Sequence, residues 1–299
     1  MHKIPNLLLK KLGFSNTDRL VILHADDIGM CQATINAYAH LDEIGAISSG
    51  AVMVPCPWFL AAEEYARSHP ETDLGIHLTL NSEWSEYRWS PLSTRDPNSS
   101  LVDKQGFFYT YHEQPQEFSE VEEVRAEISA QIELAIRSGM NPTHVDTHML
   151  TLVHPRFLRT YLETAYHFGL PAMVPRYDQE EWQKTGFFTP DESRVLAEIV
   201  DEFEQRGFPM LDSFSGLKLT VASQRLEQAT QALGTLPAGI HHFYIHPSLD
   251  TPEARAISPD WQGRVADYET FLLPELKDFL KKEGIQLIGY RAIQELMPV

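Results

Sequence analysis

Polar residues that can carry catalytic chemistry occur at four places where an apolar stretch of the sequence ends. They are Asp26 and Asp27 in LVILHADDIG, His77 in GIHLTL, His144, Asp146 and His148 in PTHVDTHM, and His246 in FYIHPS. In parallel α/β folds, catalytic and ligand-binding residues collect at the carboxyl ends of the strands. Side chains from four separate strands can therefore meet there, and the sequence predicts one shared site.

The spacing of His144, Asp146 and His148 favours a metal site. Side chains alternate along a strand, so these three share one face if the strand extends as far as His148. Three polar groups on an apolar strand are costly to bury without partners. Imidazole and carboxylate donors suit Zn²⁺, Fe²⁺, Co²⁺, Ni²⁺ or Mn²⁺, and Mg²⁺ less naturally. With a general base and a general acid beside it, such a metal ion would make a hydrolase.

Each motif also has a structural interpretation when it is taken alone. Adjacent aspartates are most often a turn or a helix cap, with Asp27 as the N-cap residue. A single histidine such as His77 is more often hydrogen-bonded inside a core. The histidines at 24, 241 and 242 are expected to pack or bond inside strands. The combination of motifs is what favours a site.

The composition restricts the class of partner. The chain has 299 residues, 43% of them hydrophobic, and a formal net charge of -18. This acidity argues against a nucleic-acid or anionic-membrane partner, because phosphate binding needs clustered Lys and Arg. A neutral, cationic or small substrate fits better.

The apolar runs and the cysteines predict the cellular location of the protein. No apolar run approaches the roughly 20 residues of a membrane span. The opening segment MHKIPNLLLKKLGFSN has only a three-leucine apolar core, too short for a signal sequence. Cys31 and Cys56 make no disulfide framework, although their pairing stays open. We therefore expect a cytoplasmic protein.

Short apolar runs alternate with amphipathic segments, which is typical of a parallel α/β sheet or barrel. The predicted strands are 20–25, 46–54, 73–78, 143–147, 170–174, 209–212, 240–245 and 285–289. Several are apolar on both faces, as buried parallel strands are. About eight strands with helices between them favour an irregular TIM-like (β/α) barrel. With no repeat and no linker, we expect a single domain over residues 1–299.

The clearest predicted helix covers 120–138. Ser119 and Glu122 match a capping box, and Gly139 is a typical C-terminal stop. The helix should bury one apolar stripe, which consists of Val121, Val124, Ile128, Ile132 and Ile136. Further helices are predicted over 155–168, 191–206 and 222–233, each followed closely by a glycine.

An aromatic-rich insert is predicted at about 81–118. A segment of this length without clear periodicity is usually a functional excursion or a flexible insert, and its aromatic residues argue against mere disorder. Candidates for stacking on sugar rings, of which at least half are expected to be packing residues instead, are Trp58, Trp84, Trp89 and Tyr109.

The four motifs, in this order, resemble those of the YdjC-like family of carbohydrate deacetylases, which includes the chitooligosaccharide and hopanoid-biosynthesis deacetylases. HADDIGM is similar to the signature NADDFGLS, DLGIHLTLNSEW to GLHLxLT, PTHVDTHM to PTHxDSHxH, and FYIHPS to HPG. DWQGRVADYETF resembles the Arg-containing segment that follows. The resemblance covers nearly the whole chain. It implies a distorted barrel related to the polysaccharide deacetylases, and removal of N-acetyl groups from a small carbohydrate.

The resemblance also implies roles for individual residues. A divalent metal ion, with zinc the first choice and magnesium or another ion the alternative, would be held by Asp27, His77 and His148. Asp26 would be the general base, and His246 would be the general acid that protonates the leaving amine. Residues expected to orient the ligands or to line the substrate pocket are His144, Asp146, Arg264 and Trp84.

Two departures from the family pattern bear on the substrate. HMLTLVHP places Met149, Leu150 and Leu152 where many members have further histidines, and HPS stands where HPG is common. The first departure removes polar groups near the pocket, which puts a chitooligosaccharide substrate in doubt. Neither departure touches the implied metal ligands.

Other functions stay open at this point. The same centre could hydrolyse a different amide or an ester. A non-catalytic sugar-binding relative is also conceivable, although it would have no need of Asp26. A two-carboxylate glycosidase is possible on a barrel, but it would not need the histidines. A homodimer is expected only because it is a common arrangement.

Overall fold

A computed structural model describes residues 5–298. Residues 1–4, which begin the segment considered above as a signal sequence, and residue 299, the last of the predicted domain, lie outside the described residues. The single-domain organisation stays a prediction.

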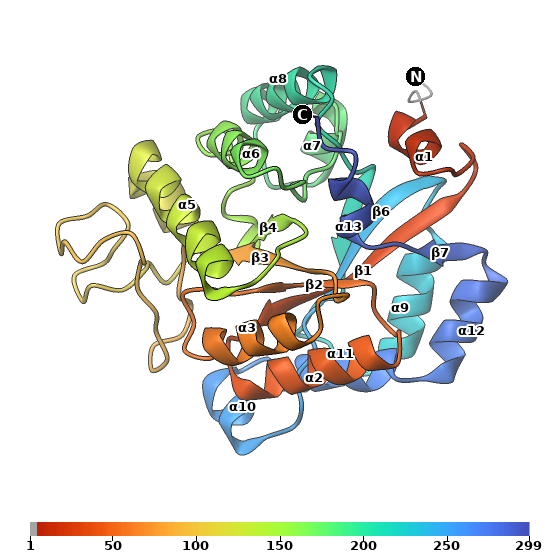
Figure 1. Ribbon diagram of the computed structural model, residues 1–299, viewed down its shortest axis with the longest axis horizontal. Coiled ribbons are helices and arrows are strands. Elements are labelled where there is room, and N and C mark those ends of the chain that lie inside the picture. The colour runs from red at the N-terminus through yellow and green to blue at the C-terminus, as the bar shows by residue number, and fades with distance from the viewer. Residues whose placement is uncertain (1–4, 299) are drawn as a thin grey trace.

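Within the described residues, seven parallel strands form one curled sheet in the order β4-β3-β2-β1-β6-β5, with β7 also paired to β1 (Figure 1). Their bounds are β1 Arg19–Ile28, β2 Ser49–Val52, β3 Leu74–Leu78, β4 Val145–Thr147, β5 Ser213–Gly216, β6 Gly239–Ile245 and β7 Ile285–Leu287. The long strand β1 uses one edge twice, because its first half pairs with β7 and its second half with β2. The predicted irregular TIM-like barrel is confirmed.

Helices surround this sheet (Figure 1). Their bounds are α1 Leu7–Lys11, α2 Gln32–Glu43, α3 Phe59–Ser68, α4 Glu113–Phe118, α5 Val121–Ser138, η1 His148–Leu150, α6 Leu158–His167, α7 Gln179–Lys184, α8 Pro190–Gln205, α9 Arg225–Gly234, α10 Pro252–Ile257, α11 Trp261–Phe271, α12 Pro274–Lys282 and α13 Tyr290–Gln294. The four helices expected from the sequence correspond to α5, α6, α8 and α9.

Both faces of the central strands are buried. Alternate residues of β1, such as Leu20 and Ile22, join an apolar cluster with Tyr290 of α13 and Leu9 of α1. The residues between them, such as Val21, join the larger cluster that packs against the surrounding helices. This double burial explains the continuous apolar run that the sequence shows before Asp26.

Helix α5 differs from its prediction at two points. Its N-cap residue is Glu120, and the hydroxyl of Ser119 donates to the carbonyl of Ser100, so the predicted capping box is wrong. Ile136 is 43% exposed, whereas the rest of the predicted stripe is buried or half-buried. Gly139 ends the helix with φ 110°, which confirms the predicted stop.

Two predicted strands are reduced to single bridges. The segment 170–174 pairs with β4 through one bridge, Val145 to Ala172, and 209–212 is held through the bridge between Pro175 and Leu211. Regular pairing on that side begins only at Ser213. The prolines in these segments have no N–H to donate to a ladder, which accounts for the irregular closure of the barrel.

The segment 81–118 is ordered by packing against α5 and the sheet, and its loops lie beside α5 in Figure 1. Trp89 is only 3% exposed and its indole N–H donates to the carbonyl of Asn81, so Trp89 is a packing residue. The Glu127 carboxylate of α5 accepts backbone hydrogen bonds from Leu92 and Ser93. These bonds hold the insert against α5.

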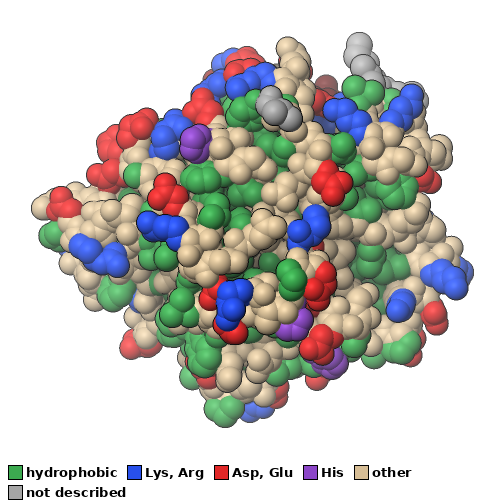
Figure 2. All heavy atoms as spheres, viewed as in Figure 1, with side chains coloured by type: hydrophobic (Ala, Val, Ile, Leu, Met, Phe, Trp, Pro, Cys, Tyr) green, Lys and Arg blue, Asp and Glu red, His purple; other side chains and the backbone are tan. Residues whose placement is uncertain are grey.

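The surface carries charges of both signs. On the face drawn in Figure 2, acidic and basic side chains are interspersed. Among the described residues, none of the helices combines the length and the apolarity that crossing a membrane would require.

Candidate metal centre

The aspartate pair lies on a bulge at the end of β1. Three steps along β1, from Ala25 to Ile28, match two steps along β2, so β1 contains one extra residue there. Asp27 adopts a left-handed backbone conformation, with φ 61°. Strict alternation would send neighbouring side chains to opposite faces, but the bulge re-aims one of them. Asp26 and Asp27 can therefore both face the carboxyl end of the sheet.

Three buried donor atoms from three strand ends converge beside this bulge. His148 Nδ1 lies 3.0 Å from Asp27 Oδ1 and 3.3 Å from His77 Nε2. His77 Nε2 lies 3.4 Å from the same Asp27 oxygen. Donors bound to one zinc ion at about 2.1 Å would be about 3.4 Å apart in a tetrahedral arrangement. The spacing of these three residues fits a single metal ion.

The outer nitrogen of each histidine faces a carboxylate. His77 Nδ1 donates to Asp146 Oδ1 at 2.8 Å, and His148 Nε2 donates to Glu83 at 3.1 Å. When both rings are neutral, His77 Nε2 and His148 Nδ1 carry no hydrogen. These two nitrogens face each other and face Asp27 Oδ1. Lone pairs brought this close repel one another unless a cation lies between them, so the donor set fits a metal ion.

The electrostatics of the cluster favour positive charge. Burial opposes protonation of His148, but Glu83 and Asp27 outweigh it and raise the pKa of His148 to about 9. Burial also opposes protonation of His77, and the charges of Asp146 and Asp26 raise its pKa well above the ordinary value. Protons therefore occupy these nitrogens in the metal-free protein, and a metal ion must displace them.

Arg264 of α11 holds the other oxygen of Asp27. Its Nη1 donates to Asp27 Oδ2 at 2.7 Å, and its Nε donates to Asp260 Oδ1 at 2.9 Å. Burial tends to raise the pKa of Asp27, but Arg264 and His148 lower it well below the ordinary value. Asp27 is therefore ionised, with Oδ1 turned towards the two histidines.

Asp26 lies beside the cluster and is more accessible, with a side chain that is 13% exposed. Its Oδ1 accepts a 2.7 Å hydrogen bond from His24 Nδ1, and its Oδ2 lies 3.7 Å from His246 Nε2. Burial raises the pKa of Asp26, but His77 and His24 outweigh it and lower that pKa below its ordinary value. His24 therefore holds one oxygen of Asp26, and the other lies towards His246.

His144 makes no hydrogen bond to the three candidate ligands. It is connected to Asp26 through His24, which lies between them. Its Nε2 lies 2.9 Å from His24 Nε2, and its Nδ1 lies 3.0 Å from the hydroxyl of Thr143. A second set of possible metal donors consists of His24, Asp26, Asp146 and His242. Both nitrogens of His24 already take part in hydrogen bonds, to Asp26 and to His144, while Asp146 bonds to His77 and His242 bonds to Tyr290.

Aromatic and apolar side chains border the centre. Arg264 lies over the ring of Trp84, 5.9 Å from its centroid, and Trp84 packs edge-on against Trp89. Trp58 is half-buried and its indole N–H donates to Glu253 at 3.3 Å. Met149, directly after His148, is 48% exposed and has φ 53°.

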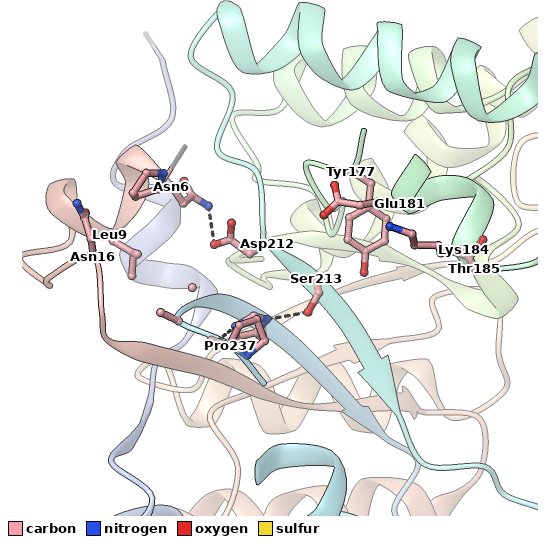
Figure 3. A pocket seen from close by; sticks show the side chains of 14 residues that line it. Asn6, Leu9, Asn16, Tyr177, Glu181, Lys184, Thr185, Asp212, Ser213 and Pro237 are labelled. Carbon is pink, nitrogen blue, oxygen red and sulfur yellow. Dashed lines mark hydrogen bonds between the residues drawn. The ribbon is translucent and has the colours of Figure 1, made fainter. Parts of the chain in front are cut away.

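A separate hollow of about 710 Å³ opens at the opposite ends of β5 and β6, next to α1 (Figure 3). Its polar atoms largely bond to one another: Asn6 donates to Asp212 at 3.0 Å, and Ser213 bonds with His241 at 2.7 Å. None of the predicted site residues lines it. The hollow is therefore separate from the cluster of Asp27, His77 and His148 at the carboxyl ends of the strands.

The structure adds two residues to those selected from the sequence. Glu83, at the start of the insert, bonds to His148, and His24 bonds to Asp26. His24 carries a signal in the sequence, because it stands two positions before Asp26 and so shares its face of the strand. Glu83 follows GIHLTLN in a loop, where no periodicity predicts a direction.

Residues 20–282 match the family model described as YdjC-like protein. A protein of Thermus thermophilus named carbohydrate deacetylase is 34% identical over 293 residues, which covers 97% of this chain and 99% of that protein. A chitooligosaccharide deacetylase of Yersinia enterocolitica is 26% identical over 284 residues, which covers 91% of this chain and 98% of that one.

A crystal structure from Enterococcus faecalis V583 has a similar fold. It superposes with a TM-score of 0.73 and 23% sequence identity, covering 93% of this chain and 99% of its own. That protein is described as a candidate cellobiose-phosphate cleavage protein. The likeness supports the irregular barrel.

Proposed function

Because this chain belongs to the YdjC-like family, we propose that it is a metal-dependent hydrolase that removes N-acetyl groups from an acetylated amino sugar or oligosaccharide. The main support is the convergence of Asp27, His77 and His148 beside the free oxygen of Asp26. The names of the relatives support a carbohydrate as the acetylated compound.

Asp27, His77 and His148 would hold one divalent ion. Two imidazoles and one carboxylate suit zinc best, with magnesium or another divalent ion as the alternative. When bound, the ion acidifies water and polarises the carbonyl of the acetamide. Asp146 and Glu83 hold the outer nitrogens of the two histidines, and thereby keep the inner nitrogens directed at the ion.

Asp26 would act as the general base. Its lowered pKa keeps it a carboxylate, the form that accepts a proton. Since Oδ1 is occupied by His24, the proton of the attacking water is taken up at Oδ2. An ionised Asp26 beside Asp27 is tolerable because Arg264 offsets the charge of Asp27, and a bound metal ion would offset it further.

His246 would act as the general acid for the leaving nitrogen. Its Nε2 lies on the side of Asp26 Oδ2, and its side chain is 18% exposed. The backbone N–H of His246 donates to Asp267 Oδ2 at 3.0 Å, and two nitrogens of Arg225 hold Oδ1 of the same carboxylate. These bonds anchor the loop after β6, while the imidazole stays free to reach a substrate.

Trp84 and Arg264 would contribute to the substrate pocket. The half-buried Trp84 lies against the Arg264 guanidinium that holds Asp27, which supports a place at the rim of the site. A sugar ring could pack on its exposed part. A cytoplasmic location and a homodimer remain predictions from the sequence.

A different amide or an ester is the second candidate for the substrate. The observation that favours it is the exposed Met149 directly after His148 in the chain, because an exposed apolar side chain suits a substrate less polar than a sugar. The same three ligand candidates and the same base would serve both reactions.

Acetate release from a panel of N-acetylated mono- and oligosaccharides tests the proposal, with simple acetyl esters and other amides as the second arm. Purified protein should contain about one divalent ion per chain. Asp26→Asn should retain that ion and lose hydrolysis, whereas His148→Ala should lose both. A fully active Asp26→Asn, or activity indifferent to chelation, would contradict the mechanism. Release of reducing sugar without acetate would indicate a glycosidase.

A further inference from the structure

A continuous chain of hydrogen bonds leads from Asp26 into the barrel interior. From the far end, Thr143 Oγ1 donates to Asp73 Oδ1 at 2.8 Å, and His144 Nδ1 lies 3.0 Å from that hydroxyl oxygen. His144 Nε2 and His24 Nε2 are 2.9 Å apart, and His24 Nδ1 lies 2.7 Å from Asp26 Oδ1. Thr143, His144 and His24 are completely buried, so water does not compete for these bonds.

Asp73 sets the direction of the chain. A carboxylate accepts hydrogen bonds and cannot donate them. Asp73 accepts from the hydroxyl of Ser49 at 2.9 Å and from the backbone N–H of Arg291 at 2.7 Å, as well as from Thr143. The one hydroxyl hydrogen of Thr143 is therefore committed to Asp73. Its oxygen can only accept, and the hydrogen must come from His144 Nδ1.

His144 passes this direction on to His24. Burial, together with the neighbouring His24 and His242, lowers the pKa of His144 well below the ordinary value, so the ring is neutral. With its hydrogen on Nδ1, its Nε2 carries a lone pair, and His24 must donate to it.

The His144 ring is also fixed in place by its neighbours. It stacks on Tyr290 with 3.9 Å between ring centroids. The ring also packs against Gly75 of β3. A Cβ atom at position 75 would come within 2.4 Å of the ring. These two contacts hold the plane of the ring, and its two nitrogens are directed at Thr143 and His24.

We propose that His24 is a positioning residue that carries a hydrogen on both ring nitrogens, donating one to His144 and the other to Asp26 Oδ1. The bond to Asp26 fixes the plane of that carboxylate and leaves Oδ2 as the oxygen that accepts the proton. The inference deepens the proposed function and rests on it for the role of Asp26. A metal ion bound by His24, Asp26, Asp146 and His242 is the competing interpretation.

Two substitutions of His24 separate its two bonds. The side-chain N–H of asparagine lies near the place of Nδ1, so His24→Asn keeps a donor for Asp26 and loses contact with His144. The amide of glutamine lies near the place of Nε2, so His24→Gln does the reverse. The exposed His167 of α6 provides matched controls, His167→Asn and His167→Gln.

We expect His24→Gln to lower kcat by about 10- to 100-fold with little change in KM, as a misplaced base does. His24→Asn should stay within about threefold of the wild type, because it keeps the donor that positions the base. Metal content and Tm should be similar in the two variants. Equal losses in both variants, or a loss confined to KM, would overturn the proposal. So would a second equivalent of zinc that disappears from both.

The protonation state of His24 can be measured by NMR in the absence of substrate. In the ¹⁵N spectrum of the zinc-loaded wild type, both ring nitrogens of His24 should carry hydrogen, with the resonance assigned by its loss in His24→Asn. An unprotonated ring nitrogen would refute the inference even if the enzyme is active. Failure of the wild type on every acetylated compound would instead refute the proposed function and leave this measurement valid.

Discussion

Nη1 of Arg264 donates a 2.7 Å hydrogen bond to Oδ2 of Asp27, and both side chains are buried. The two residues are 237 positions apart in the chain, at opposite ends of the barrel sequence. Because Arg264 occupies one oxygen of Asp27, the other is left to face His77 and His148. The arginine thus sets the direction in which Asp27 offers its charge.

Shortening this arginine should destabilise the protein. Arg264→Lys keeps the positive charge, but its one nitrogen cannot span Asp27 and Asp260, so one of these two carboxylates loses its charged partner. We expect the free energy of unfolding of the metal-free protein to fall by about 3 kcal/mol, measured by urea titration. Arg255→Lys, which alters an exposed pair with Asp250, should change it by less than about 1 kcal/mol. Equal effects of the two variants would contradict a structural role for the buried pair.

Glu83 should affect metal affinity rather than the fold. Glu83→Ala removes the hydrogen-bond partner of His148 Nε2. The ring can then rotate, and Nδ1 no longer points steadily towards Asp27 and the metal position. Removing such an outer partner typically weakens metal binding by about 10- to 100-fold, which competition with a chromogenic chelator measures. The exposed Glu86, three residues later, provides the control Glu86→Ala, for which no change is expected. Similar affinities for the two variants would show that Glu83 does not orient His148.

Metal affinity should rise with pH. The pKa of His148 is raised to about 9, and that of His77 is raised as well, so protons occupy the ligand nitrogens below that pH. Each displaced proton makes the apparent affinity increase by about tenfold per pH unit, and the contribution of His148 should level off above pH 9. Titration calorimetry at pH 6.5, 7.5 and 8.5 tests this expectation. An affinity independent of pH would argue that the two histidines are not the ligands.

Gly75 should be intolerant of a side chain. In Gly75→Ala the new Cβ would meet the ring of His144 at 2.4 Å, and Tyr290 blocks the ring from the other side. Overpacking of this kind costs about 1–3 kcal/mol, so thermal unfolding should shift to a lower temperature. The double variant Gly75→Ala, His144→Ala should recover part of the loss. If the double variant is no more stable than the sum of the two single losses, the clash is not the cause.

The faces on which polar residues of a strand lie could be predicted from the sequence, because side chains alternate between the two faces of a strand with a period of two residues. That period predicts His144, Asp146 and His148 on one face, but β4 ends at Thr147 and η1 begins at His148. It also places His24 with Asp26, and these two side chains are hydrogen-bonded. The apolar runs before them predicted parallel strands buried on both sides, which the structure confirms. Gly139 as a helix stop followed from local chemistry in the same way.

Local patterns failed where long-range contacts decide. Ser119 matches a capping box, but the nearby Ser100 carbonyl takes its hydroxyl hydrogen. The segments 170–174 and 209–212 are apolar enough for strands, but their prolines leave only single bridges. Exposure of Ile136 likewise depends on what packs against α5.

By itself, the sequence determined the periodic order of the residues and hence the α/β barrel, the strand ends that carry polar groups, and the membership of the YdjC-like family. Only the tertiary structure decided which of those groups meet. The bulge turns Asp27 beside Asp26, Arg264 selects the oxygen of Asp27 that faces the histidines, and Glu83 reaches His148 from a loop. These contacts depend on the register and curvature of the closed sheet, which no short stretch of the chain encodes.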